Sequence, residues 1–402
     1  MVVSSEKIKK VRILGLTGDE AVAQAVKQCD VDLISAYPIT PQTIIVERLS
    51  EFVANGEVDA EFIAVESEHS ALSVVTAAAL TGARVFTATS SQGLALMFEI
   101  LYITSALRAP VVMAIVNRAL SAPINIHCDH SDTMGARDSG WIQFYAENVQ
   151  EAYDLVFQAY KVAENKSVLL PTMVCLDGFT LSHTLERVEL IDDTDALKYL
   201  PSKPTYPFPI NPEKPITYGP LALPDFYFEF KVQQAEAMKQ ALKVIPEAME
   251  EFGRISGRKY GFFEAYGLED ADVAVISLGS TSGTMRYVAK ELRKEGYKVG
   301  TVKLTVYRPF PQDELAKALE NIKVIVAMDR TLSFGAVGGP LFEDLRSLFY
   351  DSEQRPLIAD VVYGLGGRDL TPDDARAIFK YGLEISKTGH VPEKVKFVGV
   401  RE

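Results

Sequence analysis

Residues 35–43 of the chain read Ser-Ala-Tyr-Pro-Ile-Thr-Pro-Gln-Thr and overlap the end of an apolar run, 31–36. Two later segments have the same form: Val-Glu-Ser-Glu-His-Ser at 65–70 and Thr-Ala-Thr-Ser-Ser-Gln-Gly-Leu at 87–94. Each stands where a strand is predicted to end and a helix to begin. Because ligands bind outside the carboxyl ends of the strands in an open α/β sheet, the three segments predict one composite site.

The residues from Val11 to about Asp192 alternate between short apolar runs and stretches of helical length. Such alternation predicts a mostly parallel sheet with helices on both faces. We assign residues 1–194 to this first domain. Its predicted strands are 31–36, 62–65, 84–88, 111–116 and 168–176, and its predicted helices are 41–53, 69–80 and 93–106.

Residues 195–268 break the alternation, because eight prolines fall between Pro201 and Pro224. This density excludes central strands and helix interiors, so an extended connector is predicted, followed by a helix over about 231–255. The connector's aromatic residues lead us to expect that it packs against the surface. These residues are Tyr206, Phe208, Tyr218, Phe226, Tyr227 and Phe228.

A second, smaller α/β unit is predicted over 269–402, which makes the fold class two doubly wound, mostly parallel domains. The alternation resumes at Ala271 and continues through the rest of the chain. The predicted strands are 273–278, 299–305, 324–327 and 358–362, and the predicted helices are 281–294, 311–319, 339–350 and 372–386.

The composition restricts the partners that the chain can have. The formal net charge of −13 argues against a nucleic-acid surface, which is usually basic. No window approaches the roughly 20 apolar residues of a membrane helix, and the first ten residues lack the apolar core of a signal peptide. The three cysteines show no Fe–S spacing and fit a reducing compartment, so a cytoplasmic location is expected.

Two of the three opening segments carry groups that fit either a helix start or a ligand. Thr40-Pro41 has the form of a threonine N-cap followed by proline at the first helical position. Glu66 and Glu68 suit the positive end of a helix, but a buried carboxylate there could also share a proton with a heterocycle nitrogen. Local sequence alone leaves both readings open at each position.

Other polar groups follow the same logic. Ser91, Gln92 and Gly93 offer a hydroxyl, an amide and backbone N–H groups at a predicted helix start. Arg108 stands at a predicted helix end, where arginine either interacts with the helix dipole or clamps a small carboxylate bidentately. The run His-Cys-Asp-His-Ser-Asp at 127–132 is too closely spaced for a usual zinc site, so we expect no metal in this chain.

Familiar cofactor motifs are missing from the sequence. It contains neither a G-x-x-x-x-G-K-[ST] loop, nor a G-x-G-x-x-G after a strand, nor a G-x-S-x-G elbow. It also lacks the Gly-Asp-Gly and downstream Asn with which thiamine-diphosphate enzymes hold Mg²⁺ and the diphosphate.

Taken in order, the polar segments resemble the α subunit of 2-oxoacid:ferredoxin oxidoreductases, and among these the pyruvate enzyme. The resemblance spans nearly the whole chain. Its segments are Tyr-Pro-Ile-Thr-Pro (37–41), Glu-Ser-Glu-His-Ser (66–70), Thr-Ala-Thr-Ser-Ser-Gln-Gly-Leu (87–94), Asp-His-Ser-Asp (129–132), Arg-Asp-Ser-Gly-Trp-Ile-Gln (137–143), Asp-Gly-Phe (177–179), Leu-Ser-His (181–183) and Tyr-Arg-Pro-Phe-Pro (307–311).

The resemblance implies a multi-chain thiamine-diphosphate enzyme that uses coenzyme A as co-substrate and ferredoxin as electron carrier. This chain would supply a pyrimidine-binding domain and a transketolase C-terminal-like domain. A β chain would hold Mg²⁺ and the diphosphate, a ferredoxin-like δ chain would hold [4Fe-4S] clusters, and a γ chain would complete the complex.

The resemblance also implies residue roles. The residue at the position of Glu68 contacts the cofactor's pyrimidine ring and promotes its proton transfer, and those at Thr40 and Arg108 contact the substrate carboxylate. We expect the remaining contacts to the pyrimidine end from Tyr37, Pro38, Ile39, Ser91, Gln92 and Gly93.

Alternative functions remain open on the sequence. A split transketolase-type enzyme would share the fold but need no electron acceptor, and a non-catalytic assembly subunit would not depend on Glu68. Within the 2-oxoacid family, pyruvate is favoured over branched-chain 2-oxoacids and 2-oxoglutarate. Oxalate is disfavoured because relatives acting on it have arginine where Thr40 stands.

Overall fold

Seven strands form the larger sheet of the computed structural model, which describes residues 12–203 and 212–401. Their order is β12-β6-β7-β5-β4-β2-β3, and all except β12 run parallel. The central strands β5 and β7 are buried along their whole length, as strands covered on both faces must be. The strands are β2 (Leu33–Ala36), β3 (Glu61–Ala64), β4 (Val85–Thr89), β5 (Val112–Asn117), β6 (Ile142–Tyr145), β7 (Thr172–Asp177) and β12 (Val306–Arg308).

Helices cover both faces of this sheet. Alternate residues of β5 divide between two cores: Val112 and Ala114 pack on one face, Met113 and Ile115 on the other. The first core is covered by α1 (Gly18–Gln28), α2 (Thr43–Ala54), α7 (Val149–Ala163), α8 (Asp193–Tyr199) and α9 (Pro224–Ser256). The second is covered by α3 (Glu68–Ala79), α4 (Ser91–Leu96), α5 (Phe98–Ala106) and α6 (Ser131–Gly135).

The smaller sheet has the order β15-β14-β13-β10-β11-β9, with only β9 antiparallel to its neighbour. Together with the first sheet it confirms the predicted class of two doubly wound α/β domains. Its strands are β9 (Phe263–Tyr266), β10 (Val273–Leu278), β11 (Val299–Leu304), β13 (Val324–Asp329), β14 (Leu357–Val362) and β15 (Val395–Phe397). Its helices are α10 (Thr281–Lys294), α11 (Gln312–Ala318), α12 (Pro340–Phe349), α13 (Pro372–Thr388) and the 3-10 turn η1 (Leu365–Gly367).

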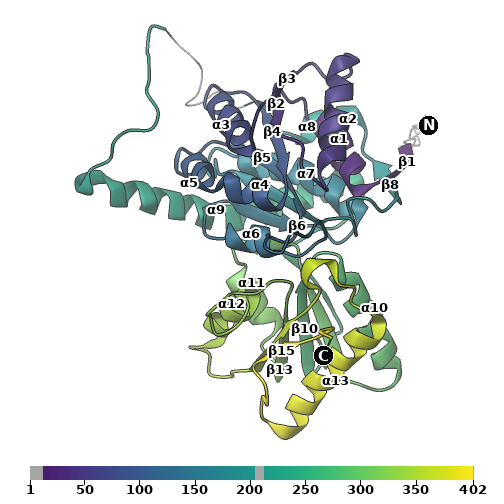
Figure 1. Ribbon diagram of the computed structural model, residues 1–402. Coiled ribbons are helices and arrows are strands. Elements are labelled where there is room, and N and C mark those ends of the chain that lie inside the picture. The colour runs from purple at the N-terminus through teal and green to yellow at the C-terminus, as the bar shows by residue number, and fades with distance from the viewer. Residues whose placement is uncertain (1–11, 204–211, 402) are drawn as a thin grey trace, which may run out of the picture.

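The two domains lie against each other (Figure 1) and share one buried core. The buried cluster that contains Met113 and Trp141 also contains Ile276 and Leu304 of the second sheet. Thr305 alone separates β11 from β12, which crosses over and pairs with β6 of the first sheet. The second domain is therefore held against the first by apolar packing and by backbone pairing.

The connector differs from expectation. Helix α9 begins at Pro224, seven residues before the predicted start, and its amino-terminal end projects from the body beyond α5 (Figure 1). The aromatic residues expected to pack down are exposed at Tyr218, Phe226, Tyr227 and Phe228, while Tyr206 and Phe208 lie outside the described residues. Proline at the first helical position lacks the N–H that a helix start leaves unpaired, so it allows this early start.

The structure differs from the predicted elements of the first domain in two further ways. The predicted helix 93–106 is two helices, α4 and α5, that meet at Met97. The first domain also contains α1, α7, α8, β6 and a two-stranded ribbon of β1 (Arg12–Leu16) and β8 (Glu186–Leu190), none of which was predicted. No helix in residues 12–203 or 212–401 is long and apolar enough to cross a membrane.

Candidate functional site

The strand order of the first sheet reverses direction at β2. The chain passes from β2 to β3 on one side of it and then to β4 on the other. Such a switch point opens a crevice outside the carboxyl ends of the strands. The side-chain amide of Gln42 connects the two segments there, because its Nε2 donates to the carbonyls of Tyr37 (2.9 Å) and Ala88 (3.1 Å).

Glu68 lies at this edge as the first residue of α3. Ser67 caps the helix by accepting a hydrogen bond from the backbone N–H of Ser70 (3.2 Å), and this sets where Glu68 stands. The side chain is 7% exposed, and no hydrogen-bond partner of its carboxylate is found among the described residues. A buried carboxylate with free acceptor sites is available to share a proton with a ligand.

Gly93 makes room for that carboxylate. A Cβ atom at Gly93 would lie 2.8 Å from Glu68 Oε1 and 2.3 Å from Thr89 Oγ1, so a larger residue would displace both side chains. Thr89 Oγ1 is itself buried and has no hydrogen-bond partner in the part of the chain that the structure describes. The starts of α3 and α4 thus meet around a carboxylate and an unpaired hydroxyl.

Arg118 joins the same edge from the end of β5. Its Nη1 donates to the carbonyl of Thr40 (2.9 Å) and its Nε donates to the carbonyl of Asn125 (2.8 Å). Two carbonyls therefore fix the plane of the guanidinium beside Thr40. The remaining N–H groups of an arginine held this way can bind a carboxylate.

Asp132 organises the loops on which these groups stand. Its carboxylate accepts hydrogen bonds from the backbone N–H groups of Ser91 (3.1 Å), Arg118 (3.0 Å) and Thr133 (2.8 Å) and from Asn117 Nδ2 (2.9 Å). Burial raises the pKa of Asp132 to about 6, although these hydrogen bonds oppose the rise. One carboxylate thus ties α6 to the ends of β4 and β5.

Arg108 does not lie with these residues. It precedes β5, at the amino edge of the sheet, whereas Thr40 follows β2 at the carboxyl edge. Its guanidinium donates to the carbonyls of Leu169 (3.1 Å) and Val168, and burial lowers its pKa. The arginine that the structure places beside Thr40 is Arg118, so the sequence-based choice of Arg108 is corrected.

Thr40 itself departs from the predicted helix start. Helix α2 begins at Thr43 with Gln42 as its N-cap, and Thr40 precedes it in an exposed turn. The side-chain amide of Gln42, the residue before the helix, is bonded to the loop and to β4. The Thr40 backbone accepts the hydrogen bond from Arg118.

The predicted cofactor residues occupy three different settings. Tyr37 and Pro38 are exposed and line an open groove of about 550 Å³ between α2 and β3, and Ile39 is half-buried next to them. The Ser91 hydroxyl is buried and lies within hydrogen-bond distance of the carbonyl of Ala119 (2.6 Å) and of Gln92 Oε1 (2.7 Å). Ser91 and Gln92 therefore hold the loop after β5, whereas Gly93 faces Glu68.

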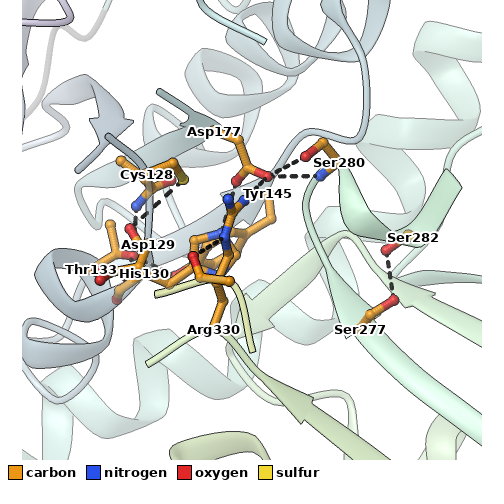
Figure 2. A network of polar contacts seen from close by, with 12 residues as sticks. Cys128, Asp129, His130, Thr133, Tyr145, Asp177, Ser277, Ser280, Ser282 and Arg330 are labelled. Atoms are coloured by element: carbon orange, nitrogen blue, oxygen red, sulfur yellow. Dashed lines mark hydrogen bonds and ion pairs between the residues drawn. The ribbon is translucent and has the colours of Figure 1, made fainter. Parts of the chain in front are cut away.

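The 127–132 run forms part of a buried contact between the domains (Figure 2). His130 Nε2 lies 2.8 Å from Asp177 Oδ1, and Arg330 Nη1 lies 2.9 Å from Asp177 Oδ2. Burial alone would raise the pKa of Asp177, but His130 and Arg330 hold it well below its usual range.

Cys128, His130 and Asp177 come close enough to hold a metal ion, with ligand atoms within 4.8 Å of one another. Burial raises the pKa of the Cys128 thiol. Arg330 is ion-paired with the carboxylate of Asp177. Asp177 thus belongs both to this group and to an ion pair that joins the two domains.

Sequence reasoning missed Arg118 and Asp132. Arg118 follows the predicted strand 111–116 more closely than Thr40 follows the strand 31–36, and this position is the signal that could have identified it. Asp132 lies in the quoted segment 129–132, but the sequence assigned it no role, because most of its partners are backbone groups and two of them belong to distant segments.

Comparison with known proteins identifies the family of the chain. Residues 24–250 match the family model for pyruvate flavodoxin/ferredoxin oxidoreductase, thiamine diphosphate-binding, and residues 271–375 match pyruvate:ferredoxin oxidoreductase core domain II. A 2-oxoglutarate:ferredoxin oxidoreductase of Magnetococcus marinus has a similar fold, with a TM-score of 0.73 and 21% identity over 93% of this chain and 65% of that one.

Curated relatives are similar over their full length. Pyruvate synthase subunit PorA of Thermotoga maritima is 51% identical over 97% of this chain and 98% of its own. The PorA subunit of Methanocaldococcus jannaschii is 49% identical over 91% and 94%, and ketoisovalerate oxidoreductase subunit VorA of Pyrococcus horikoshii is 45% identical over 97% and 98%. The chain therefore belongs to the pyruvate:ferredoxin oxidoreductase family, alongside its PorA and VorA subunits.

Proposed function

We propose that this chain is the α subunit of a multi-chain pyruvate:ferredoxin oxidoreductase. The complex would take CO₂ from pyruvate, pass two electrons to ferredoxin and transfer the acetyl group to coenzyme A, or run the reverse reaction. The observation that carries the proposal is the buried Glu68, 7% exposed and faced by Gly93, at the same sheet edge as Thr40 and Arg118. Similarity to pyruvate synthase subunits supports the choice of reaction.

The residues at this edge fit the pyrimidine end of thiamine diphosphate. Glu68 offers unpaired carboxylate oxygens in a buried position, Thr89 an unpaired hydroxyl, and Gly93 a surface without a side chain. When bound, thiamine diphosphate supplies the nucleophilic carbon and the electron sink that 2-oxoacid decarboxylation requires. Tyr37, Pro38 and Ile39 form the adjacent rim of the site in this proposal.

In this proposal, the position of each site residue sets its role. Glu68 holds a proton at a ring nitrogen of the pyrimidine, and burial strengthens that interaction. Arg118 binds the substrate carboxylate through the N–H groups that do not point to Thr40 or Asn125, and the Thr40 hydroxyl adds a donor. Asp132 holds Arg118 and Ser91 in position by accepting hydrogen bonds from their backbone N–H groups.

The remaining chemistry would come from partner chains. The chain has no Gly-Asp-Gly motif, so a β chain would hold Mg²⁺ and the diphosphate. Its three cysteines are free and buried, and a ferredoxin-like δ chain would carry the [4Fe-4S] clusters, with a γ chain also present. We place the complex in the cytoplasm, which buried free thiols fit.

A second candidate substrate class is the branched-chain 2-oxoacids. The 45% identity to a ketoisovalerate oxidoreductase subunit favours it, because that relative is aligned over the whole chain. Pyruvate and the branched-chain 2-oxoacids share the carboxylate and the carbonyl. An enzyme would therefore distinguish them through the pocket that holds the substrate's alkyl group.

The test is to assay the assembled complex with a panel of 2-oxoacids, coenzyme A and a viologen acceptor. Pyruvate should have the highest kcat/KM. A higher value for 2-ketoisovalerate would move the complex to the second class. Decarboxylation without acceptor reduction would indicate a non-redox thiamine enzyme, and full activity of a Glu68→Ala complex would indicate an assembly subunit.

A further inference from the structure

The loop that follows Arg118 connects the first domain to the second. Asn125, seven residues after Arg118, accepts the hydrogen bond from Arg118 Nε through its carbonyl. The Asn125 side chain accepts from the backbone N–H of His127 (2.7 Å) and donates from Nδ2 to the carbonyl of Gly366 in the second domain (2.9 Å). A single residue thus contacts both the guanidinium and the other domain.

The second domain approaches this loop through a turn built from glycine. Gly366 and Gly367, which follow β14, have positive φ values of +59° and +80°, a region that favours glycine. A Cβ at Gly366 would lie 2.4 Å from Asn125 Nδ2, and one at Gly367 would lie 2.3 Å from His127 Cβ. The turn therefore contacts the Arg118 loop at a distance that side chains would not permit.

Backbone hydrogen bonds strengthen the same contact. The N–H of Gly367 donates to the carbonyl of Cys128 (2.6 Å), and the N–H of Gly366 donates to Asp129 Oδ2 (3.1 Å). The backbone N–H of His130 donates to the carbonyl of Arg330 (2.8 Å). Four of the six residues 125–130 are thus hydrogen-bonded to the second domain: Asn125, Cys128, Asp129 and His130.

A buried ion pair fixes the two domains beside this loop (Figure 2). Asp177, at the end of β7, binds His130, Arg330 and the backbone N–H and hydroxyl of Ser280. Ser280 follows β10 and Arg330 follows β13, the two strands between which the order of the second sheet reverses. The edge of the second sheet at which a ligand would be expected is therefore occupied by the first domain.

We propose that Asn125 is a positioning residue for Arg118, through which the second domain sets the orientation of the guanidinium toward the substrate carboxylate. This inference rests on the proposed function, in which Arg118 binds that carboxylate. Two carbonyls fix the guanidinium plane. Thr40 supplies one from the first domain, and Asn125 supplies the other from a loop that the second domain holds.

The test uses Asn125→Asp and Asn125→Ser in the assembled complex. Asn125→Asp keeps the size and the acceptor for the His127 N–H but replaces the donor to Gly366 with a charged carboxylate oxygen, whereas Asn125→Ser removes that donor without adding a charge. The KM for pyruvate should rise with little change in kcat, and kcat/KM should fall roughly 3- to 10-fold, the factor for a lost neutral hydrogen bond. Asn165→Asp is the matched control, because Asn165 also accepts a backbone N–H two residues on, in an exposed loop.

Two further measurements separate positioning from general structural support. A double-mutant cycle of Asn125→Asp with Arg118→Lys should be non-additive, because the first change acts through the second residue. The affinity for thiamine diphosphate and the unfolding midpoint should stay near wild-type in Asn125→Asp. A parallel loss of cofactor affinity and stability, or full additivity, would overturn the positioning role.

The outcome also separates this inference from the proposed function. If Arg118→Lys impairs pyruvate use while both Asn125 variants keep wild-type kcat/KM, the positioning role is wrong and the carboxylate site stands. If Arg118→Lys itself keeps wild-type kcat/KM, the proposed site is wrong, and this inference is wrong with it.

Discussion

At the scale of single residues, Glu68 has the property that the proposed chemistry needs, which is a buried carboxylate without a partner among the described residues. Glu68→Gln keeps the size of the side chain but removes the group that shares the proton. We expect the turnover of the assembled complex to fall by roughly 10²- to 10⁴-fold, with little change in the unfolding midpoint. Steady-state assays and thermal unfolding of the same preparation check this, and wild-type turnover would remove Glu68 from the mechanism.

Arg118 and Arg108 form a natural pair of variants, because the structure places them at opposite edges of one sheet. Arg118→Lys should lower kcat/KM for pyruvate by roughly 10- to 150-fold, because an ammonium cannot replace the planar donors of a guanidinium. Arg108→Lys should leave kcat/KM near wild-type and affect only stability. The reverse ranking in the same assay would return the carboxylate site to Arg108.

At the scale of elements, the site depends on how closely the start of α4 packs against the start of α3. Gly93→Ala would bring a Cβ to 2.8 Å from Glu68 Oε1 and must displace that side chain. A misplacement of about 1 Å can cost roughly 10²-fold in rate, so we expect a loss of that size. Gly135→Ala is the control, because no atom lies within 4 Å of its added Cβ. Equal turnover for both variants would contradict the close packing.

Helix α12 begins on a buried carboxyl pair whose protonation should be visible in stability. Asp329 accepts hydrogen bonds from the N–H groups of Leu341 and Phe342 (both 3.0 Å), and Asp360 accepts one from Gly339 (2.7 Å). Burial raises the pKa of both groups, that of Asp360 to about 6. A carboxyl pKa that is higher in the folded than in the unfolded chain contributes stability that is complete below about pH 4. That contribution is lost as the pH rises through 6.

Asp360→Asn removes this titration. Wild-type loses this contribution between pH 4.5 and pH 7.5, and the variant does not. The free energy of unfolding of the variant minus that of wild-type should therefore increase by about 1–3 kcal/mol from pH 4.5 to pH 7.5. Urea unfolding of the two chains at both pH values measures the difference. Parallel pH profiles for variant and wild-type would mean that Asp360 has an ordinary pKa in the folded chain.

At the scale of the whole molecule, the proposed cofactor site is only half present in this chain. It offers groups for the pyrimidine end but no motif for the diphosphate and Mg²⁺. We therefore expect the isolated chain to bind thiamine diphosphate much more weakly than the assembled complex, and to show no iron–sulfur absorption. Calorimetry and a visible spectrum of the purified chain check both, and tight binding without a partner would contradict the divided site.

The domain contact is a second property of the whole molecule. A buried core shared by both sheets, the crossing strand β12 and the Asp177 ion pair hold the domains together. Removing one member of a buried ion pair leaves an uncompensated charge, which is more costly than losing a surface pair. In the proposed arrangement, these contacts hold the second domain where Gly366 can bond to the loop of Arg118.

The sequence by itself determined the fold class and much of the site. Continuous apolar runs of strand length, such as 273–278, coincide with a strand of the structure because a strand buried on both faces must be apolar throughout. The strand–helix order predicted that Glu68 and Gly93 lie at one edge of the sheet, and the family resemblance implied their roles. The structure brings the two residues together.

Only the tertiary structure decided which arginine stands beside Thr40 and what the second domain does. Arg108 and Arg118 lie ten residues apart, yet a strand of six residues separates the two edges of the sheet to which they belong. The contacts of Asp132, Asn125 and Gly366 join segments up to 241 residues apart and mostly involve backbone groups. Every residue except proline carries the same N–H and C=O, so these pairings leave no pattern in the sequence.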